Sequence, residues 1–121
     1  MNKSSKGPDF SKIDSQKKAI KLVSKGELEK CFLLPIEIGG QDIPQNYVFV
    51  PIGFSKIKSD IDNNIVAPLA KEGKITEYSA TPIYQGKSFI PIAIDVFASN
   101  PGEFNSRINI WGEAILNEDE A

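Results

Sequence analysis

Residues 88–99 read Ser-Phe-Ile-Pro-Ile-Ala-Ile-Asp-Val-Phe-Ala-Ser, and apolar residues recur in them with a period of two. One side of the extended chain would carry Ile90, Ile92, Ile94 and Val96. The other side would carry Pro91, Ala93, Asp95 and Phe97. Because side chains alternate between the two faces of a strand, this pattern predicts a β-strand with one buried face.

Two further strands are predicted on either side of it, over residues 75–85 and 104–111. Turn-forming residues at 85–87 and 99–102 separate the three strands, which predicts consecutive antiparallel neighbours. The last strand would place on one face Phe104, Ile108 and Ile110. Its other face would carry Asn105, Arg107, Asn109 and Trp111.

The first half of the chain predicts two helices and two strands. A helix is expected over residues 11–24, and strands are expected over residues 28–38 and 46–50. A second helix is expected to begin with Ser55 as its N-cap and to end at Gly73. Pro68 is expected to kink or shorten that helix near its end. Its buried stripe would consist of Ile57, Ile61, Ile65 and Leu69.

The predicted elements follow the order α-β-β-α-β-β-β, which is typical of an α+β domain. The sequence predicts a small antiparallel sheet of about five strands, with one main helix packed on it and an N-terminal helix. Residues 11–112 would form this single domain. Residues 1–10 are expected to be a disordered basic leader, and residues 113–121 an acidic tail.

The composition argues against most hydrolytic and metal-dependent enzymes. The chain of 121 residues has no histidine, which is the usual general base near neutral pH and the usual ligand of catalytic zinc. Its one cysteine, Cys31, lies in an apolar run and is expected to be a buried small hydrophobe. No stretch resembles a signal peptide or a membrane span, so a cytoplasmic location is expected.

Charge is distributed unevenly along the chain. Residues 1–30 hold eight lysines and four acidic residues, whereas residues 31–121 hold six basic and twelve acidic residues. The basic segment would be either the solvated face of the first helix or an arm that contacts nucleic acid or an acidic partner. The acidic remainder is a poor match for a phosphate backbone, so nucleic acid is not the expected partner.

No residue pattern predicts a catalytic site or a cofactor. Ser55 and Lys58 have Ser-x-x-Lys spacing, but Ser55 is expected to act as the helix cap. The predicted strands carry many aromatic residues, some of which must lie on the face away from the helix. Exposed aromatics are favoured anchors for a protein partner, unless the first helix or a second copy of the chain covers them. The expected partner-binding residues are Tyr84, Phe97, Arg107, Asn109 and Trp111.

Residues 39–91 resemble the later part of the DNA/RNA non-specific endonucleases found as toxin domains in bacterial polymorphic toxins. The shared features are Gly39-Gly40, Asn46, Val50-Pro51, Lys71-Glu72-Gly73-Lys74, Pro82-Ile83-Tyr84-Gln85-Gly86-Lys87-Ser88 and Pro91. That family places an Asp-x-Gly-His type motif before the paired glycines, and residues 31–38 here contain no such base. The resemblance implies a fold without the reaction. Small standalone proteins of such systems are commonly immunity proteins, which implies that role by analogy.

The sequence therefore favours a non-enzymatic protein-binding module without a cofactor, and the resemblance implies an immunity or accessory protein of a bacterial toxin system. Its partner would be a protein, with a basic toxin domain matching the acidic body. Three alternatives stay open. The first is a divergent metal-dependent nuclease or other hydrolase that uses Glu37, Asp42 and Asn46. The second is a nucleic-acid module built on the lysine-rich first helix, and the third is a homodimer that buries the aromatics.

Overall fold

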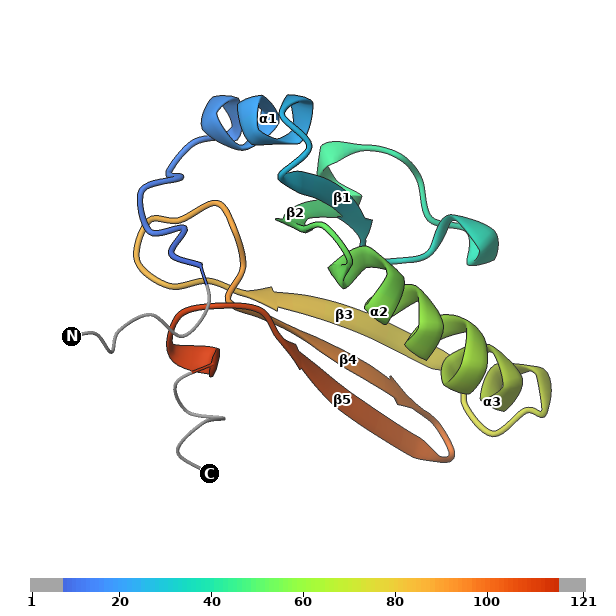
Figure 1. Cartoon of the computed structure of the whole chain (residues 1–121). Coiled ribbons are helices and arrows are strands. Elements are labelled where there is room, and N and C mark those ends of the chain that lie inside the picture. The colour runs from blue at the N-terminus through green and yellow to red at the C-terminus, as the bar shows by residue number, and fades with distance from the viewer. Residues whose placement is uncertain (1–7, 116–121) are drawn as a thin grey trace.

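The computed structural model describes residues 8–115 of the chain, which form helices and strands of a single α+β fold (Figure 1). The predicted fold class, with an N-terminal helix and a main helix, is confirmed. The helices are α1 (Gln16–Ser24), α2 (Phe54–Ile61) and α3 (Ala67–Lys71). The strands are β1 (Leu28–Phe32), β2 (Tyr47–Pro51), β3 (Glu77–Ile83), β4 (Ala93–Ser99) and β5 (Glu103–Asn109).

The strands form two antiparallel sheets, so the prediction of one five-stranded sheet is wrong. β1 pairs with β2 in a small sheet, and the large sheet has the order β3-β4-β5. Gly53, with a φ of 103°, turns the chain from β2 directly into α2. After β2 the chain therefore enters a helix and does not form a further strand that could join the two sheets. α2 runs alongside both sheets (Figure 1).

Two of the strands are shorter than predicted from the sequence, and each is shortened near a proline. β1 ends at Phe32, because Pro35 begins a 3₁₀ turn over Ile36–Ile38 and cannot donate to a ladder. β4 begins at Ala93, and residues 84–92 form a loop that contains Pro91. From Ile94 onward the predicted alternation is confirmed, since Ile94 and Val96 are buried and Phe97 is exposed, whereas Ala93, predicted on the same side as Phe97, is also buried.

The main helix is interrupted by a π turn over Asp62–Val66, between α2 and α3. Pro68 follows within the first turn of α3, where its missing N–H is tolerated. The N-cap prediction for Ser55 is wrong, because Gly53 occupies that position. The carboxylate of Glu29, from β1, accepts hydrogen bonds from the backbone N–H groups of Gly53 (2.9 Å) and Ser55 (3.2 Å). A side chain from β1 therefore supplies the cap.

The stripe predicted for the main helix is only partly confirmed. Ile61 and Leu69 are partly buried against the core, but Ile57 is 46% exposed and Ile65 is also exposed, and the buried positions are Lys58, Asp62 and Val66. The apolar periodicity is misleading here, because Lys58 and Asp62 neutralise each other inside the fold. The inward face of the main helix therefore combines this ion pair with Ile61 and Leu69.

Trp111 belongs to the core, so its prediction as an exposed partner-binding residue is wrong. β5 ends at Asn109, and the chain then turns inward, leaving Trp111 only 2% exposed. Its indole N–H donates to the backbone carbonyl of Ile90 at 3.0 Å. Phe10 packs edge-on against the indole ring, with the ring centroids 5.8 Å apart.

The packed domain accordingly extends beyond the predicted residues 11–112. Phe10 contacts the core through Trp111, and Ala114 is buried in a short helical turn. The rest of the predicted basic leader, residues 1–7, and residues 116–121 of the predicted acidic tail lie outside the described residues.

We expect Trp111→Phe to lower the free energy of unfolding by about 1–3 kcal/mol, because the buried carbonyl of Ile90 loses the indole N–H and keeps only the longer 3.4 Å hydrogen bond from the Ser88 hydroxyl. Urea denaturation followed by far-UV circular dichroism measures the change. Phe97→Leu, at a residue that is 40% exposed, is the control and is expected to change stability by less than about 0.5 kcal/mol. Equal losses in the two variants would show that Trp111 is not a core residue.

Candidate functional site

A buried polar cluster of Lys58, Asp62 and Tyr78 lies where α2 meets both sheets. The ammonium of Lys58 donates to Asp62 Oδ2 at 2.6 Å, to the Tyr78 hydroxyl at 2.8 Å and to the backbone carbonyl of Leu33 at 2.8 Å. The Tyr78 hydroxyl donates to Asp62 Oδ1 at 2.7 Å. These bonds connect the end of β1, helix α2 and strand β3.

Every polar group of this cluster has a partner. Lysine has three N–H donors and no acceptor, and all three donors of Lys58 are used. Both carboxylate oxygens of Asp62 also accept hydrogen bonds. A lysine that donates all of its protons cannot serve as the base for Ser55. The cluster is therefore a structural connection between elements.

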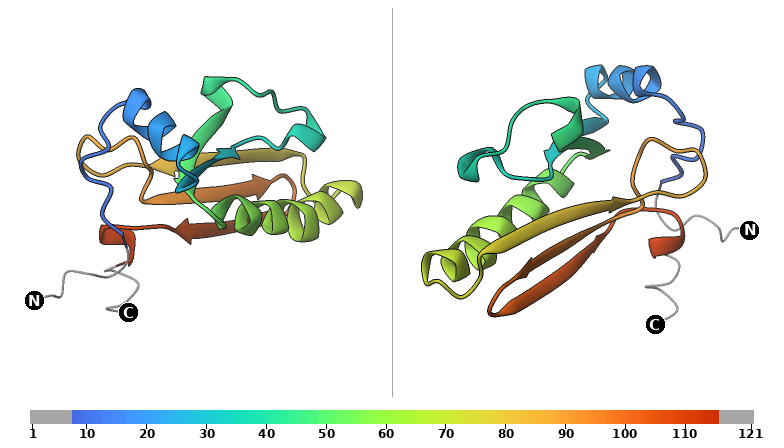
Figure 2. Two further views of the ribbon diagram at one scale, coloured as in Figure 1. Left: turned by 45° about the horizontal axis from the view of Figure 1, so that its top comes forward. Right: turned by 180° about the vertical axis from the view of Figure 1, so that it is seen from behind.

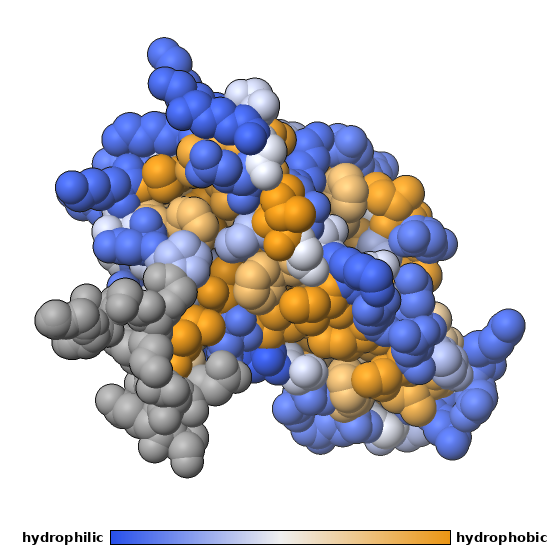
Figure 3. All heavy atoms as spheres, in the orientation of Figure 1, coloured by the Kyte–Doolittle hydropathy of each residue, from blue (hydrophilic) through white to orange (hydrophobic). Residues whose placement is uncertain are grey.

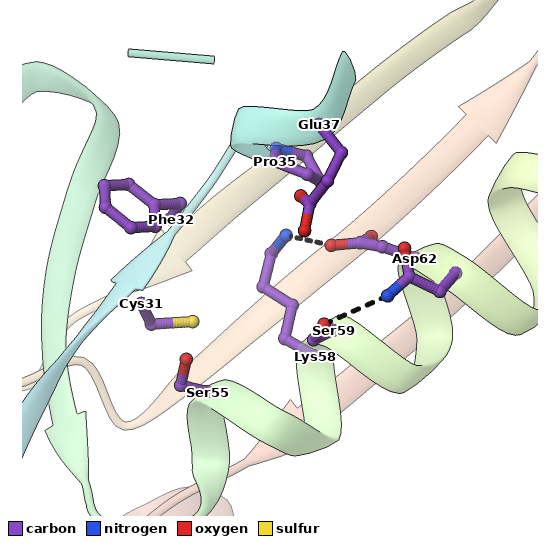
Figure 4. Close-up of a pocket in the computed structure, with 9 residues that line it drawn as sticks. Cys31, Phe32, Pro35, Glu37, Ser55, Lys58, Ser59 and Asp62 are labelled. Carbon is purple, nitrogen blue, oxygen red and sulfur yellow. Dashed lines mark hydrogen bonds and ion pairs between the residues drawn. The ribbon is translucent and has the colours of Figure 1, made fainter. Parts of the chain in front are cut away.

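A small cavity of about 60 Å³ adjoins the cluster and is lined by Cys31, Glu37, Ser55 and Ser59, among others. Figure 4 shows the ammonium of Lys58 directed at Asp62, while the thiol of Cys31 lies near Ser55 at the opposite side of the cavity. Burial raises the pKa of Cys31 to about 11. Burial, followed by the hydrogen bond to Asp62, also raises the pKa of Tyr78. Neither side chain supplies an anionic nucleophile at neutral pH.

The structure does not bring together the residues of the alternative metal site. The side-chain amide of Asn46 is used by the backbone, since it accepts from Leu34 N–H and donates to the carbonyls of Leu34 and Gln41. Asp42 forms an ion pair with Lys30, and Glu37 lies exposed on the 3₁₀ turn. Within residues 8–115, no three acidic or cysteine side chains are grouped so that they could hold a metal ion.

The predicted partner-binding residues fall on separate surfaces. Phe97, Arg107 and Asn109 lie on the outer face of the large sheet, where Arg107 forms a bidentate ion pair with Asp95 at 2.7 and 2.9 Å. Both views in Figure 2 show no helix against this face in the described part of the chain. Tyr84 lies elsewhere, in the loop after β3. Phe97 is a single aromatic residue among polar neighbours, which is ordinary for an exposed sheet face.

Tyr84 instead lines a cavity of about 160 Å³, together with three other aromatic side chains. We call this cavity the aromatic pocket. Its residues are Gln16, Pro44, Tyr47, Val48, Phe49, Tyr84 and Phe89. Tyr47 and Phe49 come from β2, whereas Tyr84 and Phe89 come from the loop 84–92. The pocket therefore exists only where the two sheets meet.

The aromatic rings of the pocket are partly fixed in position and partly open to solvent. The rings of Tyr47 and Phe49 pack edge-on with their centroids 5.6 Å apart, and Phe32 packs on Tyr47 in the same way. Tyr84 and Phe89 are 47% and 42% exposed. A second, adjoining depression of about 340 Å³ shares these two residues and also contacts Lys87. Together they form an elongated apolar surface.

A lysine-rich helix begins at the margin of the aromatic pocket. Gln16, at the start of α1, lines the pocket, and residues 12–25 around this helix carry five lysines and one acidic residue, Asp14. Figure 3 shows α1 as a hydrophilic ridge on the surface of the molecule. The ammonium of Lys30 lies 4.4 Å from the centroid of the Tyr47 ring. The lysine-rich helix predicted from sequence thus borders the aromatic residues.

Comparisons of the chain with protein-family models, with curated proteins and with solved structures found no match. The resemblance to toxin endonucleases therefore stays a prediction. Among the described residues, no helix is long and apolar enough to cross a membrane.

We expect Lys58→Met to lower the free energy of unfolding by about 3–5 kcal/mol, because it leaves the carboxylate of Asp62 buried without its cation. Lys58→Met combined with Asp62→Leu is expected to recover much of that loss. Lys56→Met is a matched control, since Lys56 and Asp60 form an ion pair of the same i,i+4 spacing on the surface. The control is expected to lose less than about 1 kcal/mol. Chemical denaturation that finds equal losses for Lys56→Met and Lys58→Met would contradict the buried role of the cluster.

The raised pKa of Cys31 predicts a loss of stability in alkali. As pH rises, the thiol of the unfolded chain ionises first, near its ordinary value of 9.0, whereas the folded thiol ionises near 11. The neutral Cys31 thiol therefore makes its full contribution to the free energy of unfolding below about pH 9. That contribution, roughly 3 kcal/mol, is lost between about pH 9 and 11. Unfolding free energies of the wild type and Cys31→Ala, measured from pH 8 to 11, are expected to converge over this window. Parallel pH profiles would contradict the prediction.

Proposed function

We propose that the protein is a non-enzymatic binding module whose aromatic pocket accepts a large apolar side chain from an acidic segment of a protein partner. The observation that carries the proposal is the convergence of Tyr47, Phe49, Tyr84 and Phe89 on one solvent-open cavity. Exposed aromatic residues gathered in a pocket are the residue type that most often dominates binding energy at protein interfaces.

The size of the pocket supports a side chain as its occupant. An apolar cavity of about 150 Å³ accommodates a ring of the size of benzene. Sites for larger small molecules usually exceed about 300 Å³ and enclose most of their ligand. The 160 Å³ of the aromatic pocket therefore matches one leucine or aromatic side chain. The adjoining depression over Tyr84, Lys87 and Phe89 would take the next residues of the same segment.

The charges around the pocket support an acidic segment. Five lysines against one aspartate in residues 12–25 give this side of the molecule a positive field, and Lys87 lies beside the open aromatic rings. Carboxylates that flank the inserted side chain would approach these lysines, which increases the rate of encounter and sets the orientation. The basic toxin domain expected as a partner matches this surface less well than an acidic segment does.

The immunity role stays a narrower prediction within this proposal, because it depends on which protein carries the segment. The hydrolase alternative has no group of three metal-ligating side chains in the described part of the chain to support it, and the clustered Lys58, Asp62 and Tyr78 are engaged with one another. Binding of single-stranded nucleic acid is the competing function, since exposed aromatics beside lysines also stack bases.

A random peptide library selected on the full chain tests the proposal. We expect the selected peptides to carry a leucine or aromatic residue next to aspartate or glutamate. Isothermal titration calorimetry is then expected to show at least about a tenfold loss of affinity for Tyr84→Ala and for Phe89→Ala. Lys87→Glu is expected to weaken binding less, and to reduce its dependence on salt.

Phe97→Ala is the matched control, because Phe97 is exposed to a similar degree but lies on the outer face of the large sheet. It is expected to leave peptide affinity unchanged. Peptides whose affinity depends on Phe97 and not on Tyr84 would move the binding surface to the sheet face. Tight binding of a single-stranded oligonucleotide at Tyr84 and Phe89, with no peptide selected, would replace the proposal by the nucleic-acid function.

A further inference from the structure

A short helical turn over residues 112–115 lies against the loop that carries Tyr84. The backbone N–H of Glu113 donates to Gln85 Oε1 at 2.9 Å. A Cβ at Gly112, whose φ is 65°, would lie 2.8 Å from the same oxygen, so the close approach of the turn to Gln85 requires glycine. Figures 1 and 2 show the turn beside the loop 84–92 in each view. The chain that follows this turn therefore starts next to Gln85.

The same loop forms the apolar depression that adjoins the aromatic pocket. Tyr84 and Gly86, the two chain neighbours of Gln85, both line this depression of about 340 Å³, together with the next three residues of the loop. The side chain of Gln85 thus holds the turn 112–115 in place, while its neighbours form the depression. Because consecutive Cα atoms are about 3.8 Å apart, a segment that leaves the turn starts close to Tyr84.

The residues that follow have the composition that the proposed function requires of a bound segment. Residues 116–120, which we call the tail segment, read Leu-Asn-Glu-Asp-Glu. Leu116 supplies a large apolar side chain, and the three consecutive acidic residues 118–120 are the longest acidic run in the chain. Leu116 comes three residues after Glu113, and three extended residues span up to about 11 Å. This length is enough to pass Gln85 and reach the residues beside it.

Lysines beside the depression complement the acidic residues of the tail segment. Lys87 lines the depression itself. Lys18 donates a hydrogen bond to Asp14 at 2.8 Å, and the pKa of Asp14 is lowered first by this bond and further by the charge of Lys87. Two lysines therefore act on one carboxylate, which leaves a net positive charge next to the depression. Carboxylates at positions 118–120 would be attracted to it.

We propose that the tail segment folds back onto its own molecule, with Leu116 over Tyr84 and Phe89 and the acidic residues beside Lys87. It then competes with the partner segment for the same aromatic rings. Attachment to the turn 112–115 gives the tail segment an effective concentration of about a millimolar. The apparent affinity for a partner is therefore reduced by the fraction of molecules whose rings are open. This inference rests on the proposed function, because it concerns the regulation of the same surface.

Isothermal titration calorimetry of full-length variants tests the proposal, with a synthetic peptide of residues 113–121 as the probe. The tail variant combines Leu116→Ser with Glu118→Gln, Asp119→Asn and Glu120→Gln. We expect it to bind the probe at least about fivefold more tightly than the wild-type chain does, because its own tail no longer covers the rings. Adding Tyr84→Ala to the tail variant is expected to remove this gain.

The matched control combines Glu72→Gln, Glu77→Gln and Glu103→Gln, which removes three negative charges from exposed positions elsewhere in the chain. It is expected to leave the affinity for the probe nearly unchanged, and a gain equal to that of the tail variant would overturn the proposal.

Equal binding of the probe by the wild type and the tail variant, lost in both on Tyr84→Ala, would overturn the tail contact and leave the proposed function in place. Failure of every acidic peptide to bind the tail variant would contradict the proposed function as well. Sedimentation equilibrium separates the intramolecular contact from exchange between copies. A wild-type dimer that the tail variant abolishes would place the tail segment on a second copy and overturn the intramolecular contact.

Discussion

The buried contact between Lys58, Asp62 and Tyr78 is the constraint on which the rest of this structure depends. Two small sheets share no strand pairing, and helix α2 connects them through this cluster. A buried ion pair is not by itself a strong source of stability, because desolvation offsets most of the attraction. Its effect here is specificity: the three donors of Lys58 are all satisfied only when β1, α2 and β3 adopt this arrangement.

The candidate binding surface follows from the same arrangement. β2 carries Tyr47 and Phe49, and the loop after β3 carries Tyr84 and Phe89, so the aromatic pocket forms only when both sheets are held together. Gln16, at the start of the lysine-rich helix α1, also lines this pocket. The outer sheet face and the β5 edge lie on the large sheet alone. The proposed binding surface thus depends on both sheets, whereas the outer sheet face depends on one.

Strand patterns were predictable from sequence, whereas the position of α2 was not. The alternation of Ile94 and Val96 with Asp95 and Phe97 reports directly on burial, since one face of a strand is apolar and the other is open to solvent. The stripe Ile57–Ile61–Ile65–Leu69 looked equally clear, but only Ile61 and Leu69 pack against the core, and Lys58 and Asp62 are the buried positions. The burial of Lys58 cannot be predicted from one sequence, because two of its partners, Tyr78 and the carbonyl of Leu33, come from distant segments of the chain. The burial of Trp111 could not be predicted either, because the chain turns inward only after the end of β5. The aromatic pocket was also not predictable, because its four rings come from two separate segments.

Backbone amide chemical shifts offer the most direct test of the central claim, that the aromatic pocket is the binding surface. A ¹⁵N-labelled sample titrated with a short peptide that contains one leucine flanked by glutamates would be followed by heteronuclear NMR. The account predicts that the largest shifts fall on Gln16, Tyr47, Tyr84 and Phe89, with the amides around Phe97 unchanged. Shifts confined to β4 and β5, or an absence of shifts at millimolar peptide, would contradict it.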